Sequence, residues 1–173
     1  AAGIVRSQGG TVTAVDLARW TIAFYRGQSA RYGIDSDFRE LGYLILAFDA
    51  DEERAARERV ALQRAAGLDS RWVDAAKAGA LLPILDPARI HGATYCAQDG
   101  SMSPPRNMAA ALVALRAAGG ELRERTPVTG LEIDGGRVRG VRTPGGVIGA
   151  ERVILAGGVA QPRLSTLGGG RAV

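Results

Sequence analysis

The spacing of hydrophobic residues changes its period part-way along the chain, and this change limits the folds open to it. Apolar residues first recur at helical spacing, so we expect helices over residues 13–27, 49–67 and 104–118. Beyond residue 120, apolar and polar residues alternate between glycine pairs at 135–136 and 145–146, which predicts a meander of short strands. The chain therefore combines helices with antiparallel strands.

Two runs rich in β-forming residues lie among the helices, at residues 38–48 and 90–97. We expect each to be a strand, and we expect the two to pair because an isolated strand needs a partner. Gly42 inside the first run predicts a bulge or a close backbone contact. A turn is expected at Asp99–Gly100. The predicted fold class is α+β, or mixed α/β, with an antiparallel sheet and helices.

The apolar run 153–156 is followed directly by Gly157 and Gly158, and we expect a final strand that ends in this glycine turn. Glycines at the carboxyl end of a buried strand let a phosphate or a cofactor approach the backbone, because a side chain there would collide with it. The same pattern also fits an ordinary glycine loop. The stretch alone leaves both interpretations open.

The composition narrows the function classes. The net charge is +4, and the 22 basic residues are 21 arginines and Lys77. No basic run with interleaved aromatic residues is present, so nucleic-acid binding is not expected.

A lone Cys96 excludes an internal disulfide, and with His91 as the only histidine no metal-ligand cluster of the usual kind is expected. No apolar run approaches the roughly 20 residues that span a bilayer, so we expect no membrane association and a cytoplasmic protein.

Four stretches carry a family resemblance: AAGIVRSQ, LGYLILAFDADEE, HGATYCAQDGSMSPPRNMAAALVALRAAGGEL and TPVTGLEIDGGRVRGVRTPGGVIGAERVILAGGVA. Each motif is weak by itself, whereas their succession in this order is specific. Together they resemble the D-amino-acid oxidase (DAO) superfamily of flavoproteins, in particular its sarcosine oxidase β-subunit and glycine oxidase group. The resemblance covers the chain from Ala1 to about Leu167.

This resemblance implies FAD as the cofactor and a Rossmann-like FAD-binding domain beside a substrate domain with a large antiparallel sheet. Residues 1–10 would be a flavin-facing loop of the FAD-binding domain, and residues 11–96 a portion of the substrate domain. Residues 97–173 would be a further portion of the FAD-binding domain, with the meander and the final strand. No G-x-G-x-x-G fingerprint follows a strand, so we expect an internal fragment of a longer protein.

Site residues follow from the same resemblance. The loop whose amides and basic side chain lie over the isoalloxazine ring is matched by Gly3, Ile4, Val5 and Arg6. The position that faces the adenine ring is matched by Val128, and the turn at the diphosphate and ribitol by Ala156, Gly157 and Gly158. In the family an aromatic residue and then Ser or Thr usually follow this turn, and Val159 and Ala160 stand there instead, which weakens the expected hydrogen bonding to the cofactor.

Arg6 is the candidate catalytic residue. A positive charge near the flavin N1 and C2 carbonyl stabilises the anionic reduced flavin, and one on the substrate side pairs with a carboxylate. An ordinary exposed arginine is the alternative interpretation. His91 and Tyr95 are further acid–base candidates, although polar-tipped side chains on a strand more commonly serve in packing.

The resemblance implies oxidation of the C–N bond of a secondary amine or an amino acid, of the sarcosine, glycine or D-amino-acid type, by hydride transfer to the flavin. A small-molecule substrate and the flanking segments or other subunits are then the expected partners. We expect the 173-residue chain alone to be inactive, because the helix N-terminus that neutralises the cofactor diphosphate lies outside it. The alternative is a non-catalytic fragment or an assembly subunit that keeps the fold.

Overall fold

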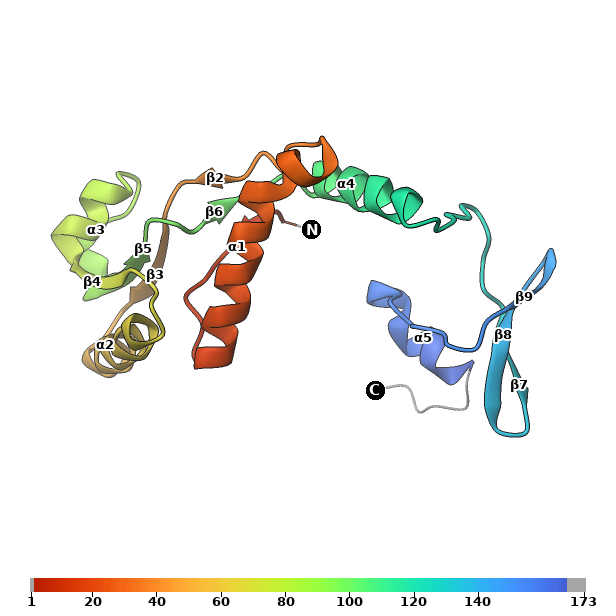
Figure 1. Cartoon of the computed structure of the whole chain (residues 1–173). Helices are drawn as coiled ribbons and strands as arrows, with labels where there is room; N and C mark the ends of the chain where they lie inside the picture. The colour runs from red at the N-terminus through yellow and green to blue at the C-terminus, as the bar shows by residue number, and fades with distance from the viewer. Residues whose placement is uncertain (1, 168–173) are drawn as a thin grey trace. The chain divides into compact units, whose positions relative to one another are not determined.

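The computed structural model describes residues 2–167, and the chain forms two compact units (Figure 1). The first unit is Ala1–Gly120 and the second is Glu121–Val173. The boundary follows the last long helix of the first unit, where helical spacing of apolar residues gives way to alternation. Among the described residues no helix is long and apolar enough to cross a bilayer.

The first unit combines helices with two small sheets. Its helical segments are α1 (Val12–Tyr32), α2 (Ala50–Ala65), α3 (Ala75–Leu81), the 3-10 turn η1 (Pro87–Arg89) and α4 (Pro104–Ala117). Its strands are β1 (Ile4–Val5), β2 (Arg39–Glu40), β3 (Tyr43–Ala47), β4 (Ser70–Asp74), β5 (Gly92–Cys96) and β6 (Gly100–Ser101).

Both sheets of the first unit are antiparallel and three-stranded. One has the order β1–β6–β2 and the other the order β3–β5–β4. In the second sheet Thr94 of β5 lies opposite Ile45 of β3 and Trp72 of β4. The predicted pairing between the runs 38–48 and 90–97 is therefore confirmed.

The run 38–48 is two strands rather than one. It divides at Leu41 and Gly42, whose N–H groups both donate to the carbonyl oxygen of Asp99, at 3.1 and 2.8 Å. Gly42 has a φ of +76°, and a Cβ on it would lie 2.5 Å from the Tyr95 ring, so the predicted close contact is confirmed. The backbone therefore leaves one sheet at β2 and enters the other at β3.

The predicted turn at Asp99–Gly100 is wrong by two residues. The turn lies at residues 97–98, and Gly100 begins β6. A Cβ on Gly100 would collide with the carbonyl oxygen of Arg39 in β2. This glycine is thus required by the close approach of two strands, and not by a turn conformation.

The three predicted helices are confirmed as α1, α2 and α4, with one change of boundary. We expected α1 to end near Gly27, but it continues to Tyr32 and ends at Gly33, which has a left-handed φ of +69°. Gly27 has open space around its Cβ position and does not interrupt the helix. Asp49 caps α2 by accepting a hydrogen bond from the Glu52 N–H at 2.8 Å.

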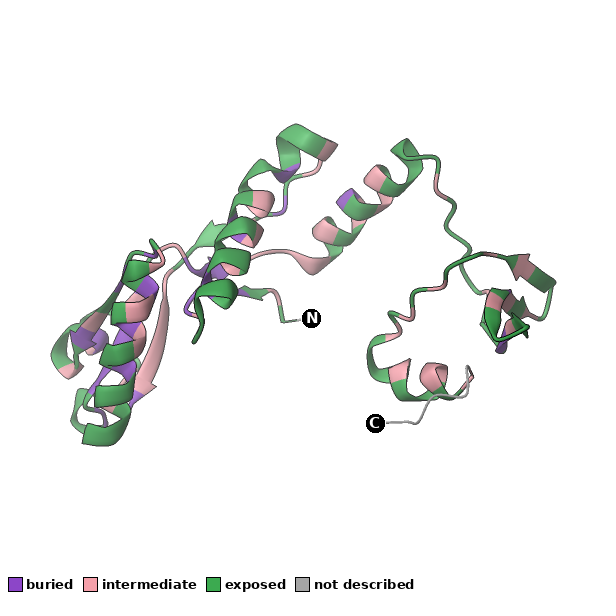
Figure 2. Cartoon of the chain, turned by 60° about the horizontal axis from the view of Figure 1, so that its bottom comes forward, coloured by how far each residue is buried: buried purple, intermediate pink, exposed green. Residues whose placement is uncertain are grey.

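The core of the first unit lies between the β3–β5–β4 sheet and its helices. The buried positions of α2 are Ala56, Val60 and Gln63, whose spacing places them on one face, and this helix contacts β4 and β5 (Figure 2). Two hydrophobic clusters fill the space, and they consist of Val73, Ala78, Ile90 and Ala93, and of Val15, Leu68 and Cys96.

The second unit is a three-stranded meander followed by a short helix. Its strands are β7 (Gly130–Asp134), β8 (Arg137–Thr143) and β9 (Gly146–Gly149), in that order and antiparallel, and they are followed by η2 (Gly158–Ala160) and α5 (Gln161–Thr166). The turns lie at Gly135–Gly136 and Pro144–Gly145, beside or within the glycine pairs that predicted them. The predicted mixture of helices and antiparallel strands is confirmed.

The predicted final strand over 153–156 is absent from the described residues. This segment is extended, but it pairs with no strand that the structure describes, and Ile154 is 90% exposed. A strand is stabilised by ladder hydrogen bonds to a neighbour, so an apolar run without a neighbour stays outside a sheet. The assignment of residues 11–96 and 97–173 to two functional domains stays a prediction.

We predict that Gly42→Ala destabilises the protein by about 1–3 kcal/mol, because alanine would have to adopt a left-handed backbone beside the Tyr95 ring. Gly27→Ala is the matched control. Its Cβ meets open space on an exposed helix, so it should stabilise the protein by about 0.5–1 kcal/mol. Denaturant unfolding measures both changes, and equal effects of the two substitutions would contradict the role of Gly42.

Candidate functional site

The segment from Ile4 to Ser7 has an alternating pattern of burial, and Gln8 after it is buried as well. Val5 and Ser7 are buried, whereas Ile4 is 58% exposed and Arg6 is also exposed. This alternation is the side-chain period of an extended strand, with one face toward the interior and one face outward. Four of the predicted site residues therefore lie together, and the two with outward side chains are Ile4 and Arg6.

Gly3 is required by the packing of the chain itself. It has a φ of +72°, and a Cβ on it would lie 2.5 Å from the carbonyl oxygen of Met102. The Gly3 carbonyl also accepts a hydrogen bond from the Met102 N–H at 2.8 Å. This glycine directly precedes β1 and lies close against the segment that follows β6.

The hydrogen-bond register of β1 determines which backbone groups face outward. Gly3 bonds to Met102, and Val5 pairs with Gly100 of β6. Because alternate residues of a strand turn their backbone groups to opposite edges, the N–H groups of Ile4 and Arg6 point away from β6. β1 is an edge strand of its sheet, so this side of it holds no strand among the described residues.

A buried carboxylate anchors the end of this segment. Asp99 is fully buried, and its Oδ1 accepts hydrogen bonds from the Ser7 N–H at 2.7 Å and from the Ser7 hydroxyl. The Ser7 hydroxyl also lies 3.5 Å from the Sγ of Cys96. Burial raises the pKa of the Cys96 thiol. These groups hold Ser7 against the junction of β5 and β6.

Gln8 extends the same network into the β3–β5–β4 sheet. Its Nε2 donates to Asp99 Oδ2 and to the carbonyl oxygen of Tyr43, both at 3.0 Å. Its Oε1 accepts a hydrogen bond from the Thr94 hydroxyl at 2.6 Å. The side chain of Gln8 thus joins Asp99 to strands β3 and β5.

A further anchor holds the next residue along the chain. Gln63 of α2 is almost fully buried and donates from its Nε2 to the Gly9 carbonyl oxygen at 2.9 Å. A Cβ on Gly9 would lie 2.8 Å from the Cβ of Ala14, so the start of α1 passes close to this point. Residues 7–9 are therefore fixed by groups from α2, β5 and the turn before β6.

An open cavity of about 340 Å³ lies between β1 and α1. It is lined by Ile4, Val5, Arg6, Ala14, Leu17, Ala18, Thr21 and Tyr25. Its volume falls within the range of about 300–1,000 Å³ that is usual for small-ligand sites. Arg6 is the one charged group in this lining, and it forms no ion pair within the described part of the chain.

The other predicted cofactor contacts lie in the second unit. Val128 is 36% exposed. It precedes Thr129, whose N–H donates to the Arg142 carbonyl oxygen at 2.8 Å. Ala156 ends the extended segment, and Gly157 and Gly158 lead into η2.

Local packing and backbone conformation explain why positions 157 and 158 are glycines. A Cβ on Gly157 would collide with the side chain of Leu164, and Gly158 has a φ of +54°. The Gly157 N–H donates to Oε1 of Gln161 at 3.0 Å. Both glycines are therefore consistent with the loop interpretation as well as with a cofactor contact.

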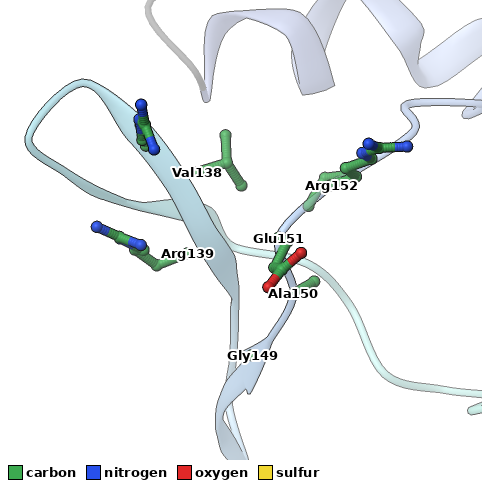
Figure 3. Close-up of a pocket in the computed structure, with 8 residues that line it drawn as sticks. Val138, Arg139, Gly149, Ala150, Glu151 and Arg152 are labelled. Atoms are coloured by element: carbon green, nitrogen blue, oxygen red, sulfur yellow. The ribbon is translucent and has the colours of Figure 1, made fainter.

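A larger open pocket of about 850 Å³ in the second unit carries several charges. It is bordered by Arg137, Arg139, Glu151 and Arg152, among other residues. Figure 3 shows the side chains of Arg139 and Arg152 extending to opposite sides, with Glu151 between them. The guanidinium groups of Arg139 and Arg152 therefore do not converge on one point, and Arg139 instead lies 3.5 Å from the carboxylate of Asp134.

Of the two acid–base candidates, Tyr95 has a packing role in the structure, and His91 lies at the surface beside Glu53. The ring of Tyr95 lies against Gly42, and the guanidinium of Arg71 lies 5.2 Å from its centroid. His91 is exposed, and its Nδ1 lies 3.4 Å from Glu53 Oε2. The hydrogen bond from Arg57, more than the contact with His91, holds the pKa of Glu53 below its usual value.

Sequence reasoning missed the residues that hold the site together. Asp99 was interpreted as part of an Asp-Gly turn, and Ser7, Gln8 and Thr94 carried no recognised motif. The available signal was the group of small and polar residues directly after the exposed Arg6, within a segment of strand character. Nothing in that pattern identifies a partner more than 80 positions away.

The sequence matches the family described as "DAO: FAD dependent oxidoreductase" over residues 1–171. A 4-methylaminobutanoate oxidase (formaldehyde-forming) from Paenarthrobacter nicotinovorans is 31% identical, over 92% of this chain and 19% of that protein. A glycine oxidase from Pseudomonas putida is 34% identical, over 88% of this chain and 42% of that protein.

Solved structures show the same fold. A glycine oxidase from Geobacillus kaustophilus superposes with a TM-score of 0.78 at 30% identity, over 98% of this chain and 47% of that one. An L-proline dehydrogenase from P. horikoshii gives a TM-score of 0.86 at 24% identity. The chain spans less than half the length of the relatives it matches. The chain belongs to the DAO family of FAD-dependent oxidoreductases.

Proposed function

We propose that the protein containing this chain oxidises the C–N bond of a secondary amine or an amino acid, with FAD as the electron acceptor. The family match over residues 1–171 carries this proposal. Relatives named as oxidases of 4-methylaminobutanoate and of glycine support the substrate class. A cytoplasmic location and the participation of further subunits stay predictions.

The segment Gly3–Arg6 fits the isoalloxazine ring of FAD. The N–H groups of Ile4 and Arg6 point away from β6, and the same residues border the cavity beside α1. A flavin ring offers carbonyl and nitrogen acceptors along one edge, which match backbone donors and a guanidinium. When bound, FAD supplies the oxidant that takes a hydride from the substrate carbon.

In this proposal the chain's own residues bind the cofactor and orient it. Gly3, Ile4, Val5 and Arg6 place backbone amides and one charge along the ring. The adenine side and the diphosphate side are assigned to Val128, Ala156, Gly157 and Gly158. The assignment of these four residues rests on the family resemblance of their motifs, and their backbone positions at a strand entry and a glycine turn are compatible with it.

Arg6 has an electrostatic role. Its guanidinium stabilises negative charge that develops at the N1 and C2 carbonyl end of the ring, or it pairs with a substrate carboxylate. Its exposure and the lack of an ion-pair partner within the described residues leave it available for either contact. The charge is most effective in a site from which substrate and cofactor exclude water.

The first test uses the purified full-length protein that contains this chain, because we expect the 173-residue chain alone to be inactive. We predict absorption at flavin wavelengths and bleaching of the flavin when sarcosine, glycine or a D-amino acid is added without oxygen. The control is 2-aminoisobutyrate, whose α-carbon bears no hydrogen and which should bleach nothing. A protein that carries no flavin and binds none when FAD is supplied would support the alternative of a non-catalytic assembly subunit.

We predict that Arg6→Gln lowers the midpoint potential of bound FAD. Loss of one charge-assisted contact weakens binding of the reduced cofactor relative to the oxidised one by roughly tenfold. For a two-electron couple this corresponds to about 30 mV. Arg54→Gln is the control, because Arg54 pairs with Asp51 on an exposed face of α2. An unchanged potential in Arg6→Gln would remove Arg6 from the site.

A further inference from the structure

We propose that Asp99 is a positioning residue, which directs Arg6 by fixing the peptide bond that joins Arg6 to Ser7. This inference rests on the proposed function of Arg6. The N–H that Asp99 Oδ1 accepts at 2.7 Å is the N–H of that peptide. Because a peptide is planar and trans, fixing its N–H fixes the Arg6 carbonyl in the opposite direction. The Arg6 backbone and the start of its side chain then face the cavity side.

Because burial alternates along the segment, holding Ser7 inward also determines that Arg6 points outward. Val5 and Ser7 hold the inner face, and Arg6 lies between them with its side chain outward. A single-residue slip would turn Arg6 inward, since successive side chains of a strand point to opposite faces. The two hydrogen bonds from Ser7 to Asp99 oppose such a slip at the residue next to Arg6.

The chemistry of the network requires a carboxylate at position 99. The groups that face its two oxygens are the Ser7 N–H, the Ser7 hydroxyl and the Gln8 amide nitrogen, and all of them act as donors. Among the described residues Asp99 has no ion-pair partner, so these neutral donors alone offset its buried charge. An asparagine would direct an NH₂ group at one of these donors.

Gln8 makes the position of Arg6 depend on the β3–β5–β4 sheet. Its side chain contacts Asp99, Tyr43 and Thr94 together. Rotation of its amide to suit an asparagine at position 99 would break its bonds to the sheet. A substitution of Asp99 would therefore disturb both the hydrogen bonds of Ser7 and the hydrogen bonds of Gln8 to the sheet.

The test is a double-mutant cycle of Asp99→Asn and Arg6→Gln in the FAD-loaded protein, read as the midpoint potential of the bound flavin. We expect Asp99→Asn to weaken binding of the reduced cofactor relative to the oxidised one by roughly three- to tenfold. For a two-electron couple this lowers the midpoint potential by about 15–30 mV. In the Arg6→Gln background Asp99→Asn should no longer lower the potential. Asp86→Asn, at an exposed turn cap, is the matched control and should leave the potential unchanged.

The sign of the change distinguishes positioning from a direct field. Removing the negative charge of Asp99 would by itself raise the potential, because it favours a more negative cofactor. In the protein that keeps Arg6, a rise or no change of the potential on Asp99→Asn would overturn the inference. A fall of equal size in the Arg6→Gln background would overturn it as well. No effect of Arg6→Gln alone would instead overturn the proposed role of Arg6, and the inference with it.

Ser7→Ala covers the case in which Asp99→Asn does not fold. This variant keeps the N–H bond to Asp99 and removes the hydroxyl, with its bond to Asp99 and its contact with Cys96 Sγ. We expect a smaller fall in the potential, again absent in the Arg6→Gln background. A fall of the same size in both backgrounds would contradict positioning through Arg6.

Discussion

The buried carboxylate of Asp99 accepts hydrogen bonds from residues that lie 92 and 91 positions away in the sequence, Ser7 and Gln8. Its backbone carbonyl holds Leu41 and Gly42, where the chain passes from one sheet to the other. The segment after the edge strand β1, the sheet crossing and the start of β6 therefore meet at one residue, Asp99. Because this charge is buried without a cation among the described residues, its geometry depends on all of these donors together.

Local patterns predicted much of the fold. The helical spacing of apolar residues located α1, α2 and α4, and the glycine pairs located the turns between β7, β8 and β9. The β-rich composition of two runs predicted β3 and β5, and their need for partners predicted the ladder between them. These features depend on residues close in the sequence, or on a requirement that each strand has by itself.

Features that depend on contacts between residues far apart in the sequence could not be predicted from it. Gly27 resembled a helix stop, but α1 passes through it and ends at Gly33, whose left-handed φ of +69° closes the helix. The run 153–156 has strand composition, but a strand also needs a neighbour. Asp99 and Gly100 resembled a turn, whereas the carboxylate serves Ser7 and the glycine admits the Arg39 carbonyl. The family resemblance located the β1 segment, but not the network that holds it.

A crystal structure of the FAD-loaded protein would show whether Asp99 holds the segment Gly3–Ser7 at the flavin. We predict the isoalloxazine ring beside β1, with Arg6 along its N1 and C2 carbonyl edge or at the substrate. Asp99 Oδ1 should remain within hydrogen-bond distance of the Ser7 N–H. A flavin ring bound elsewhere, or a β1 segment released from Asp99 while the flavin is bound, would contradict the account.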